Sequence, residues 1–126
     1  MSTILWKPKN TEDTHLSKFI GQINSKYNLD LKTYNDLHSW SVKNKSEFWL
    51  SIWDFFEIIG SKGTEPYIEP INEMPGSKFF PNGSVNYAEN MLSGDVSGTA
   101  IVFKSEDKIR RELSWKDLKV QVATLA

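Results

Sequence analysis

The side chains that most often perform chemistry are few in this sequence, and they form no known catalytic or metal-binding pattern. The two histidines, His15 and His38, have no Cys, His, Asp or Glu partner at the spacing of an HExxH or HxxxH motif. Asp13 lies close to His15, but its position is better explained by electrostatics in the first turn of a helix. The sequence contains no cysteine, which excludes disulfides, thiolate metal ligands and Cys nucleophiles.

Two other patterns match phosphate-binding sites only superficially. Arg110 and Arg111 are adjacent in an expected strand, so their side chains point to opposite faces and cannot clamp one phosphate. Ser97-Gly98-Thr99 is followed by an apolar run typical of a strand, whereas a phosphate-binding loop needs a lysine close behind it. None of the 16 Asp and Glu residues stands out as a catalytic pair. The sequence therefore predicts no catalytic, cofactor-binding or metal-binding residue.

Composition narrows the class of protein. The chain has 126 residues, 39% hydrophobic and 25% charged, as expected of one globular domain or a piece of a larger one. A net charge of -1 argues against a nucleic-acid partner. The many aromatic residues could stack on bases or sugars, but the helical spacing of Trp49, Trp53 and Phe56 favours packing in a core.

No segment has the pattern of a membrane or secretion signal. The most apolar window, residues 48–59, is shorter than the roughly 20 residues that span a bilayer, and polar residues interrupt it. The first eight residues lack the apolar stretch of a signal peptide. We expect a cytoplasmic protein without a membrane partner.

The first half of the sequence predicts three helices. Asn10 or Thr11 is expected to cap the first, and Asn28 to end it. Its apolar positions recur at helical spacing: Leu16, Phe19, Ile20, Ile23 and Tyr27. A capping box of Thr33 and Asp36 begins the second helix, which ends near Val42.

The third helix is expected to begin with a box of Asn44 and Glu47 and to end at Gly60. Its polar side chains occupy a sector of about 120° on a helical wheel, and large apolar side chains fill most of the rest. A surface helix needs a narrower apolar stripe, so this helix is expected to have neighbours on two sides.

The remaining residues change character twice. Prolines and glycines in 61–83 predict an irregular, extended crossing, held by Tyr67, Ile68, Ile71, Phe79 and Phe80. Ser84 is then expected to cap a short helix through Leu92, closed by Gly94.

A hairpin and a last helix follow. Thr99–Lys104 and Ile109–Leu113 are the expected strands, joined by a turn at 106–108. Ser114 and Asp117 form a capping box for a helix that keeps its amphipathic pattern to the end of the sequence. The expected class is an α+β fragment, mostly helical over 1–98, with a hairpin and a truncated helix over 99–126.

Several of these segments together resemble the N-terminal region of acetoacetyl-CoA synthetases, within the adenylate-forming acyl-CoA synthetase superfamily. The matching pieces are Trp6-Lys7-Pro8, Leu37–Val42, Glu47–Trp49, Trp53–Phe55, Met74–Pro81, Val85–Leu92 and Arg111–Leu118. The chain departs from that family at Phe79, Asn82, Val85 and Met91, all at positions compatible with packing roles. The resemblance covers nearly the whole chain, in order.

The resemblance implies a longer enzyme that activates acetoacetate with ATP and Mg²⁺ to an acyl-adenylate, then transfers the acyl group to CoA. The family's phosphate loop, its acidic ribose-binding residue and its catalytic lysine have no matching position here. Residues 1–98 would then form the entry layer of the enzyme's large N-terminal domain, and 99–126 the start of its AMP-binding domain. We expect this part to be inactive by itself and structural, with the rest of its own chain as its partner.

Two alternatives stay open. The chain is consistent with a fragment of an acetyl- or propionyl-CoA synthetase, because no residue that selects the acid is present, although acetyl-CoA synthetases match Trp40-Ser41-Val42 and Asn86–Asn90 less well. It is also consistent with a stand-alone helical module that binds a partner helix through Trp49, Trp53 and Phe56. Self-association through exposed apolar surface or through the hairpin edge is a further expectation. Within Asn86–Asn90, hydrogen bonding to a neighbouring loop is favoured over contact with a ligand.

Overall fold

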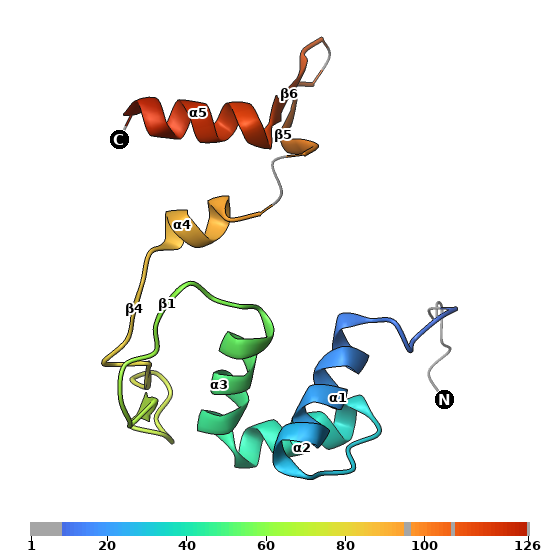
Figure 1. The fold of residues 1–126 in the computed structure, drawn as a ribbon, viewed down its shortest axis with the longest axis vertical. Coiled ribbons are helices and arrows are strands. Elements are labelled where there is room, and N and C mark those ends of the chain that lie inside the picture. Colours follow the sequence, from blue (N-terminus) through green and yellow to red (C-terminus); the bar gives the residue numbers. More distant parts are fainter. Residues whose placement is uncertain (1–8, 95–96, 107, 126) are drawn as a thin grey trace. The chain divides into compact units, whose positions relative to one another are not determined.

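The computed structural model describes residues 9–94, 97–106 and 108–125, and this part of the chain is a small α+β structure with five helices and three two-stranded antiparallel sheets (Figure 1). Trp6-Lys7-Pro8 and Asp107 of the expected turn lie outside the described residues. The chain divides into two compact units. Unit 1 contains described residues 9–58 and 62–83, and unit 2 contains 59–61 and 84–125.

Helix α1 (His15–Tyr27) begins later than the sequence predicts. Thr14 is the N-cap, because its side-chain oxygen accepts a hydrogen bond from the Ser17 backbone N–H at 3.2 Å. The expected caps, Asn10 and Thr11, are wrong: Asn10 accepts from the Glu12 N–H, and the Thr11 carbonyl accepts from the Thr14 hydroxyl, so both belong to a preceding turn. The predicted end is confirmed, since Asn28 has the left-handed conformation with φ 52°.

Helix α2 (Tyr34–Lys43) carries the predicted capping box. Thr33 accepts from the Asp36 N–H, and the Asp36 carboxylate accepts from the Thr33 N–H at 2.8 Å. The second box is wrong: Asn44 precedes α3 (Lys45–Phe55) but makes no side-chain cap bond to it. Asn44 also ends α2, and its side-chain nitrogen instead donates to the Trp40 carbonyl at 3.0 Å.

The end of α3 lies before the predicted Gly60. Glu57 adopts the left-handed conformation with φ 50°, and its N–H donates to the Asp54 carbonyl. The next N–H, that of Ile58, donates to the Trp53 carbonyl at 3.1 Å. These two bonds form a Schellman motif, which closes the helix without glycine. Gly60 instead belongs to strand β1 (Gly60–Ser61).

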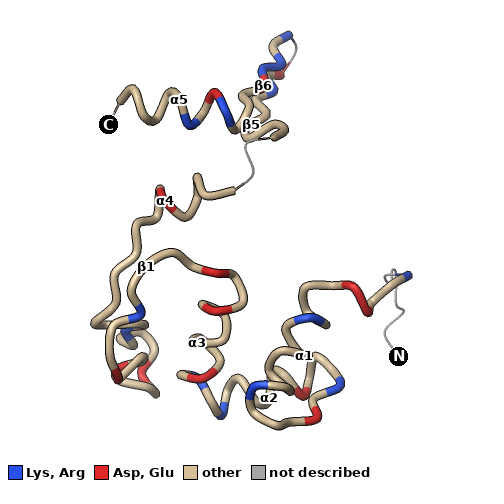
Figure 2. The backbone as a smooth tube through the Cα atoms, in the orientation of Figure 1, with Lys and Arg blue, Asp and Glu red and all other residues tan. Residues whose placement is uncertain are grey.

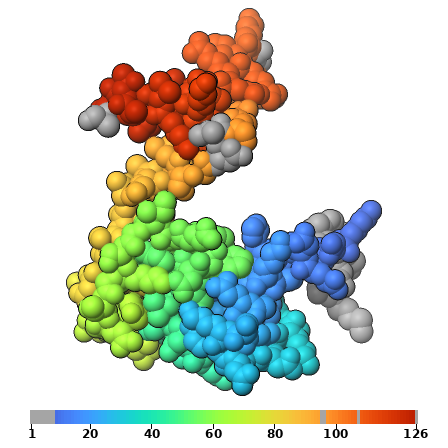
Figure 3. All heavy atoms as spheres, in the orientation of Figure 1, coloured from blue at the N-terminus to red at the C-terminus, as the bar shows by residue number. Residues whose placement is uncertain are grey.

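The core of unit 1 lies between the three helices. Phe19, Ile23 and Leu37 are buried at its centre, and aromatic rings of α3 surround Phe19. The ring centroids of Phe48 and Phe55 lie 5.9 and 5.1 Å from that of Phe19, both in edge-on geometry. In the space-filling view the atoms of these helices, blue to green, pack without a visible gap (Figure 3).

The prediction that α3 has neighbours on two sides is confirmed. Phe48 and Phe55 face the core, whereas Trp49 and Trp53 contact the crossing segment. The Trp49 and Phe79 ring centroids are 5.2 Å apart, and those of Trp53 and Phe80 are 4.9 Å apart.

Ser61, the first residue of the crossing predicted for 61–83, belongs to β1, so the crossing runs over 62–83, where two short strands form a small sheet. Strand β2 (Ile68–Glu69) pairs antiparallel with β3 (Lys78–Phe79), and Ile68 is buried. Gly63, at φ 70°, lies so close to Asn82 that an added Cβ would stand 2.2 Å from the Asn82 carbonyl oxygen. The crossing therefore folds back on itself at a position that only glycine can occupy.

Unit 2 consists of short elements around a hairpin. Strand β1 pairs with β4 (Ser84–Val85), and α4 (Tyr87–Leu92) follows. Its predicted cap, Ser84, is wrong, because Ser84 pairs with Ser61; Asn86 is the N-cap and accepts from the Glu89 N–H. Ser93, and not Gly94, is the C-cap.

The predicted hairpin and final helix are confirmed. Strand β5 (Thr99–Lys104) pairs antiparallel with β6 (Arg110–Ser114). Strand β6 begins and ends one residue later than the expected second strand, Ile109–Leu113. Helix α5 (Trp115–Leu125) begins where the Ser114 hydroxyl accepts from the Asp117 N–H at 3.1 Å. No described residue of unit 2 is buried.

Candidate functional site

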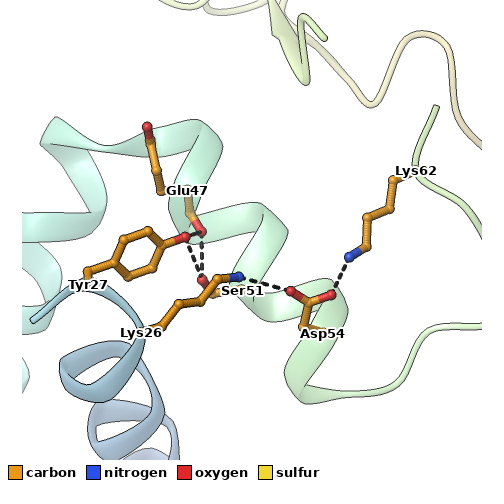
Figure 4. Close-up of polar contacts among 6 residues, drawn as sticks. All are labelled: Lys26, Tyr27, Glu47, Ser51, Asp54 and Lys62. Atoms are coloured by element: carbon orange, nitrogen blue, oxygen red, sulfur yellow. Dashed lines mark hydrogen bonds and ion pairs between the residues drawn. The ribbon is translucent and has the colours of Figure 1, made fainter. Parts of the chain in front are cut away.

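A carboxylate held between two lysines is the strongest electrostatic feature of unit 1. Asp54 of α3 accepts from Lys26 of α1 at 3.0 Å and, through its other oxygen, from Lys62 of the crossing (Figure 4). The hydrogen bond from Lys62 is the main cause that lowers the pKa of Asp54, although burial opposes it. The bond to Asp54 likewise raises the pKa of Lys26. A carboxylate so stabilised is a weak base, and it ties α1, α3 and the crossing together.

A buried hydroxyl lies one turn away from this ion-pair cluster. Ser51 is fully buried, and its Oγ donates to the Glu47 carbonyl at 2.8 Å (Figure 4). The Tyr27 hydroxyl lies 3.3 Å from the Ser51 Oγ and from the same carbonyl oxygen. Neither partner is a general base at neutral pH, so the contacts do not activate Ser51 as a nucleophile. The three groups satisfy one another within the packed helices.

An apolar groove of about 600 Å³ lies between the α2–α3 junction and the crossing of unit 1. Trp49 and Phe79 form one wall, and Val42 and Ile71 contribute further apolar surface. We call this feature the 49/79 groove. Its volume is in the range of sites that take a small ligand or a few side chains.

The residues that the sequence singled out do not converge on these features. The His15 ring meets the edge of Phe55 at 6.3 Å between centroids, and the His38 ring stacks on Tyr34. Arg110 pairs with Glu112 at 2.8 Å, whereas Arg111 lies opposite Phe103 in the hairpin, which confirms that the two arginines face apart.

The two remaining segments have structural partners. Gly98 directly precedes β5, and its carbonyl accepts from the Trp115 N–H at 3.2 Å. Asn90 accepts from the Ile59 N–H at 2.9 Å and donates to the Ile59 carbonyl at 2.8 Å. These two hydrogen bonds between Asn90 and Ile59 match the expectation that this segment holds a neighbouring loop.

Sequence reasoning missed the ion-pair cluster of Lys26, Asp54 and Lys62. It placed Asp54 and Ser51 on the polar side of α3, where a solvent-exposed face was the natural interpretation. Lys26 and Asp54 are 28 residues apart in the sequence, so no local pattern of residues predicts that they form an ion pair. The exposure of Trp49 and Phe79 could not be read either, because their helical or strand spacing is typical of a core.

Both acidic and basic residues occur along the backbone of each unit (Figure 2). Within the described ranges there is no group of three or more His, Asp or Glu side chains that could hold a metal ion. No helix among the described residues is long and apolar enough to cross a bilayer.

Comparison with known proteins gives a consistent set of relatives. The chain is 31% identical, over 96% of its length, to an acetoacetyl-coenzyme A synthetase from Rhizobium meliloti (strain 1021). It is 35% identical over 85% of its length to an acetoacetyl-CoA synthetase from Danio rerio. It is also 30% identical over 94% of its length to the malonamoyl-CoA synthetase vrtB from Penicillium aethiopicum.

These matches cover only a small part of each relative. The chain spans 19%, 16% and 17% of the lengths of the three proteins, in that order. No protein-family profile matches the chain, and no solved structure matches it.

Proposed function

We propose that this chain, which is similar along most of its length to acetoacetyl-CoA synthetases, is the N-terminal, structural part of an enzyme that makes acetoacetyl-CoA from acetoacetate, ATP and CoA. The observation that carries the proposal is the similarity along nearly the whole chain to a segment of about one fifth of those enzymes. The reaction would pass through an acyl-adenylate, with Mg²⁺ bound by the complete enzyme, in the cytoplasm.

The contacts in unit 1 support a structural role. Adenylation needs preorganised positive charge and amide donors around the transferring phosphate. The ammonium groups of Lys26 and Lys62 are instead directed at Asp54. The buried Ser51 hydroxyl is likewise engaged by neighbouring helix atoms. These groups position helices and leave phosphate chemistry to other parts of the enzyme.

The two parts of the chain would have different places in that enzyme. Residues 1–98 would be the entry layer of its large domain, and residues 99–126 the start of its AMP-binding domain. The β5–β6 hairpin supports this division, since among the described residues neither outer edge pairs with a further strand, so both could extend a larger sheet.

The test compares the 126-residue chain with its complete gene product. Each is purified and given acetoacetate, ATP, Mg²⁺ and CoA, and release of AMP and pyrophosphate is measured. The complete product is expected to release both steadily, and the 126-residue chain to release neither. Steady release by the short chain, or a gene product that ends at Ala126, would overturn the proposal and would favour a stand-alone module.

A second candidate function differs in the carboxylic acid that the complete enzyme would activate. The malonamoyl-CoA synthetase from Penicillium aethiopicum shares this segment at 30% identity, so the segment occurs with more than one acid. The same assay with acetate, propionate and malonamate at equal concentrations identifies the substrate. The highest kcat/KM is expected with acetoacetate, because most of the similar proteins bear that name.

A further inference from the structure

The 49/79 groove is not a gap left by an unfinished core. Unit 1 already buries Phe19, Ile23 and Leu37 between its helices. Around the groove, by contrast, Val42 is 54% exposed, and Trp49 and Phe79 also keep large exposed fractions. Met74, at the rim, is 99% exposed. A flexible apolar side chain beside a fixed aromatic wall is typical of a surface that adapts to another chain.

The walls of the groove are held in place by hydrogen bonds. The Lys45 ammonium donates to the Ile71 carbonyl at 2.9 Å and to the Asn72 side-chain oxygen at 3.1 Å. The Ser77 hydroxyl lies 2.6 Å from the carbonyl oxygens of Pro70 and Glu73. These contacts fix the turn between β2 and β3 against the start of α3. A preorganised wall loses less entropy when an occupant binds.

The size of the groove discriminates between occupants. A groove of about 600 Å³ takes only a few side chains. A segment of the same polypeptide needs much less contact, because a tether supplies an effective concentration in the millimolar range. About four fifths of the length of the relatives lies outside this chain, so such a segment has ample sequence to come from.

We propose that the 49/79 groove receives one or more apolar side chains from the part of the same polypeptide that follows residue 126, and so docks unit 1 onto the remainder of the enzyme. This inference rests on the proposed function, since it needs a longer chain. The occupant is an internal protein segment, not a soluble ligand and not a second copy.

Photo-crosslinking in the complete gene product tests the proposal. A p-benzoylphenylalanine residue replaces Met74 at the rim of the groove, and in a control protein it replaces Tyr34, which is 62% exposed on α2 and does not line the groove. Irradiation at position 74 is expected to give a crosslink within one molecule to a peptide beyond residue 126, several-fold stronger than at position 34. Peptide mapping by mass spectrometry identifies the peptide that is crosslinked to position 74.

Three outcomes overturn the proposal. They are a crosslink of dimer mass, a crosslink at position 74 no stronger than the control, and an intramolecular crosslink that stays within residues 1–126. A second variant checks that the groove itself is responsible. Val42→Glu puts a charge on the groove at an exposed position that unit 1 tolerates, and it is expected to reduce the position-74 crosslink several-fold, whereas Tyr34→Glu leaves it unchanged.

The failure of this inference is separable from that of the proposed function. Ligase activity without the intramolecular crosslink would refute the proposed occupant of the groove and leave the proposed function unaffected. The crosslink without release of AMP and pyrophosphate would refute the proposed reaction, whereas it would support the 49/79 groove as a docking surface.

Discussion

Unit 1 and unit 2 contain similar kinds of apolar side chain, yet only unit 1 buries them. In unit 1 three helices pack around Phe19, Ile23 and Leu37, so these side chains are covered on all sides. In unit 2 a two-stranded hairpin and one helix leave Ile101 and Phe103 about half exposed. Two strands and a helix can cover one face of a sheet at most.

The difference indicates where stability resides. Unit 1 has the elements to fold cooperatively, because its core is closed by three helices that all lie within residues 15–55. Unit 2 holds its elements by backbone pairing, caps and single polar contacts, such as the bond from Lys119 to the Gly94 carbonyl at 3.0 Å. We expect mutations in the two units to have effects of different size and kind.

The largest expected effect is that of Phe19→Ala. The ring is 5% exposed and contacts Phe48 and Phe55, so its removal should cost about 3–5 kcal/mol of the free energy of unfolding of unit 1. The matched change in unit 2, Phe103→Ala, removes a ring that is 55% exposed and should cost less than about 1 kcal/mol. Urea unfolding followed by circular dichroism measures both. Equal losses would contradict the contrast between the units.

Asn90→Ala tests the strongest polar contact of unit 2. It removes both bonds to Ile59 and a third to the Asn86 carbonyl, at an expected cost of about 1–2 kcal/mol. Hydrogen exchange of the Ile59 amide should accelerate. In the complete enzyme the thermal midpoint should fall while KM stays constant, since a ligand contact would instead raise KM with stability unchanged. Asn35→Ala, on the exposed side of α2, is the control and should change neither.

The two confirmed caps offer a matched pair. Thr33→Ala removes the cap of α2 and should lower the stability of unit 1 by about 1 kcal/mol, as a shift of one cooperative transition. Ser114→Ala removes the cap of α5, where no core holds the helix, and should appear as lost helical signal before any unfolding. Far-ultraviolet circular dichroism in the absence of urea separates the two responses. A cooperative shift for Ser114→Ala would show that unit 2 has a core in solution.

The smallest expected effect is the pH dependence that Asp54 gives to unit 1. Its pKa is lower in the folded state than in the unfolded state, so the carboxylate contributes stability above its unfolded pKa. This contribution is lost as the pH falls through the lower, folded value. Because Asp54 is 35% exposed, the contribution should stay below about 1 kcal/mol. Asp54→Asn should reduce the difference in urea midpoint between pH 7 and pH 3, while Asp30→Asn, in an exposed pair with Lys32, should not.

The outcome for individual elements shows which predictions local patterns can support. The Thr33–Asp36 box and the strand Thr99–Lys104 are confirmed, because a cap depends on neighbours three residues apart and a hairpin strand on alternation. The caps at Asn10, Asn44 and Ser84 are wrong for a different reason. Each is a good capping residue that another contact occupies: a preceding turn, the end of α2 or the pairing with β1.

The sequence by itself determined the order of the five helices and of the β5–β6 hairpin, the stop at Asn28 and the similarity to acetoacetyl-CoA synthetases, since these depend on residue type and short spacing. Only the tertiary structure decided that Asp54 lies between Lys26 and Lys62, that Ser51 is buried and that Trp49 borders an open groove. The physical reason is that these contacts join residues from separate elements. Their side chains become neighbours only when the helices pack, and no spacing along the chain encodes that approach.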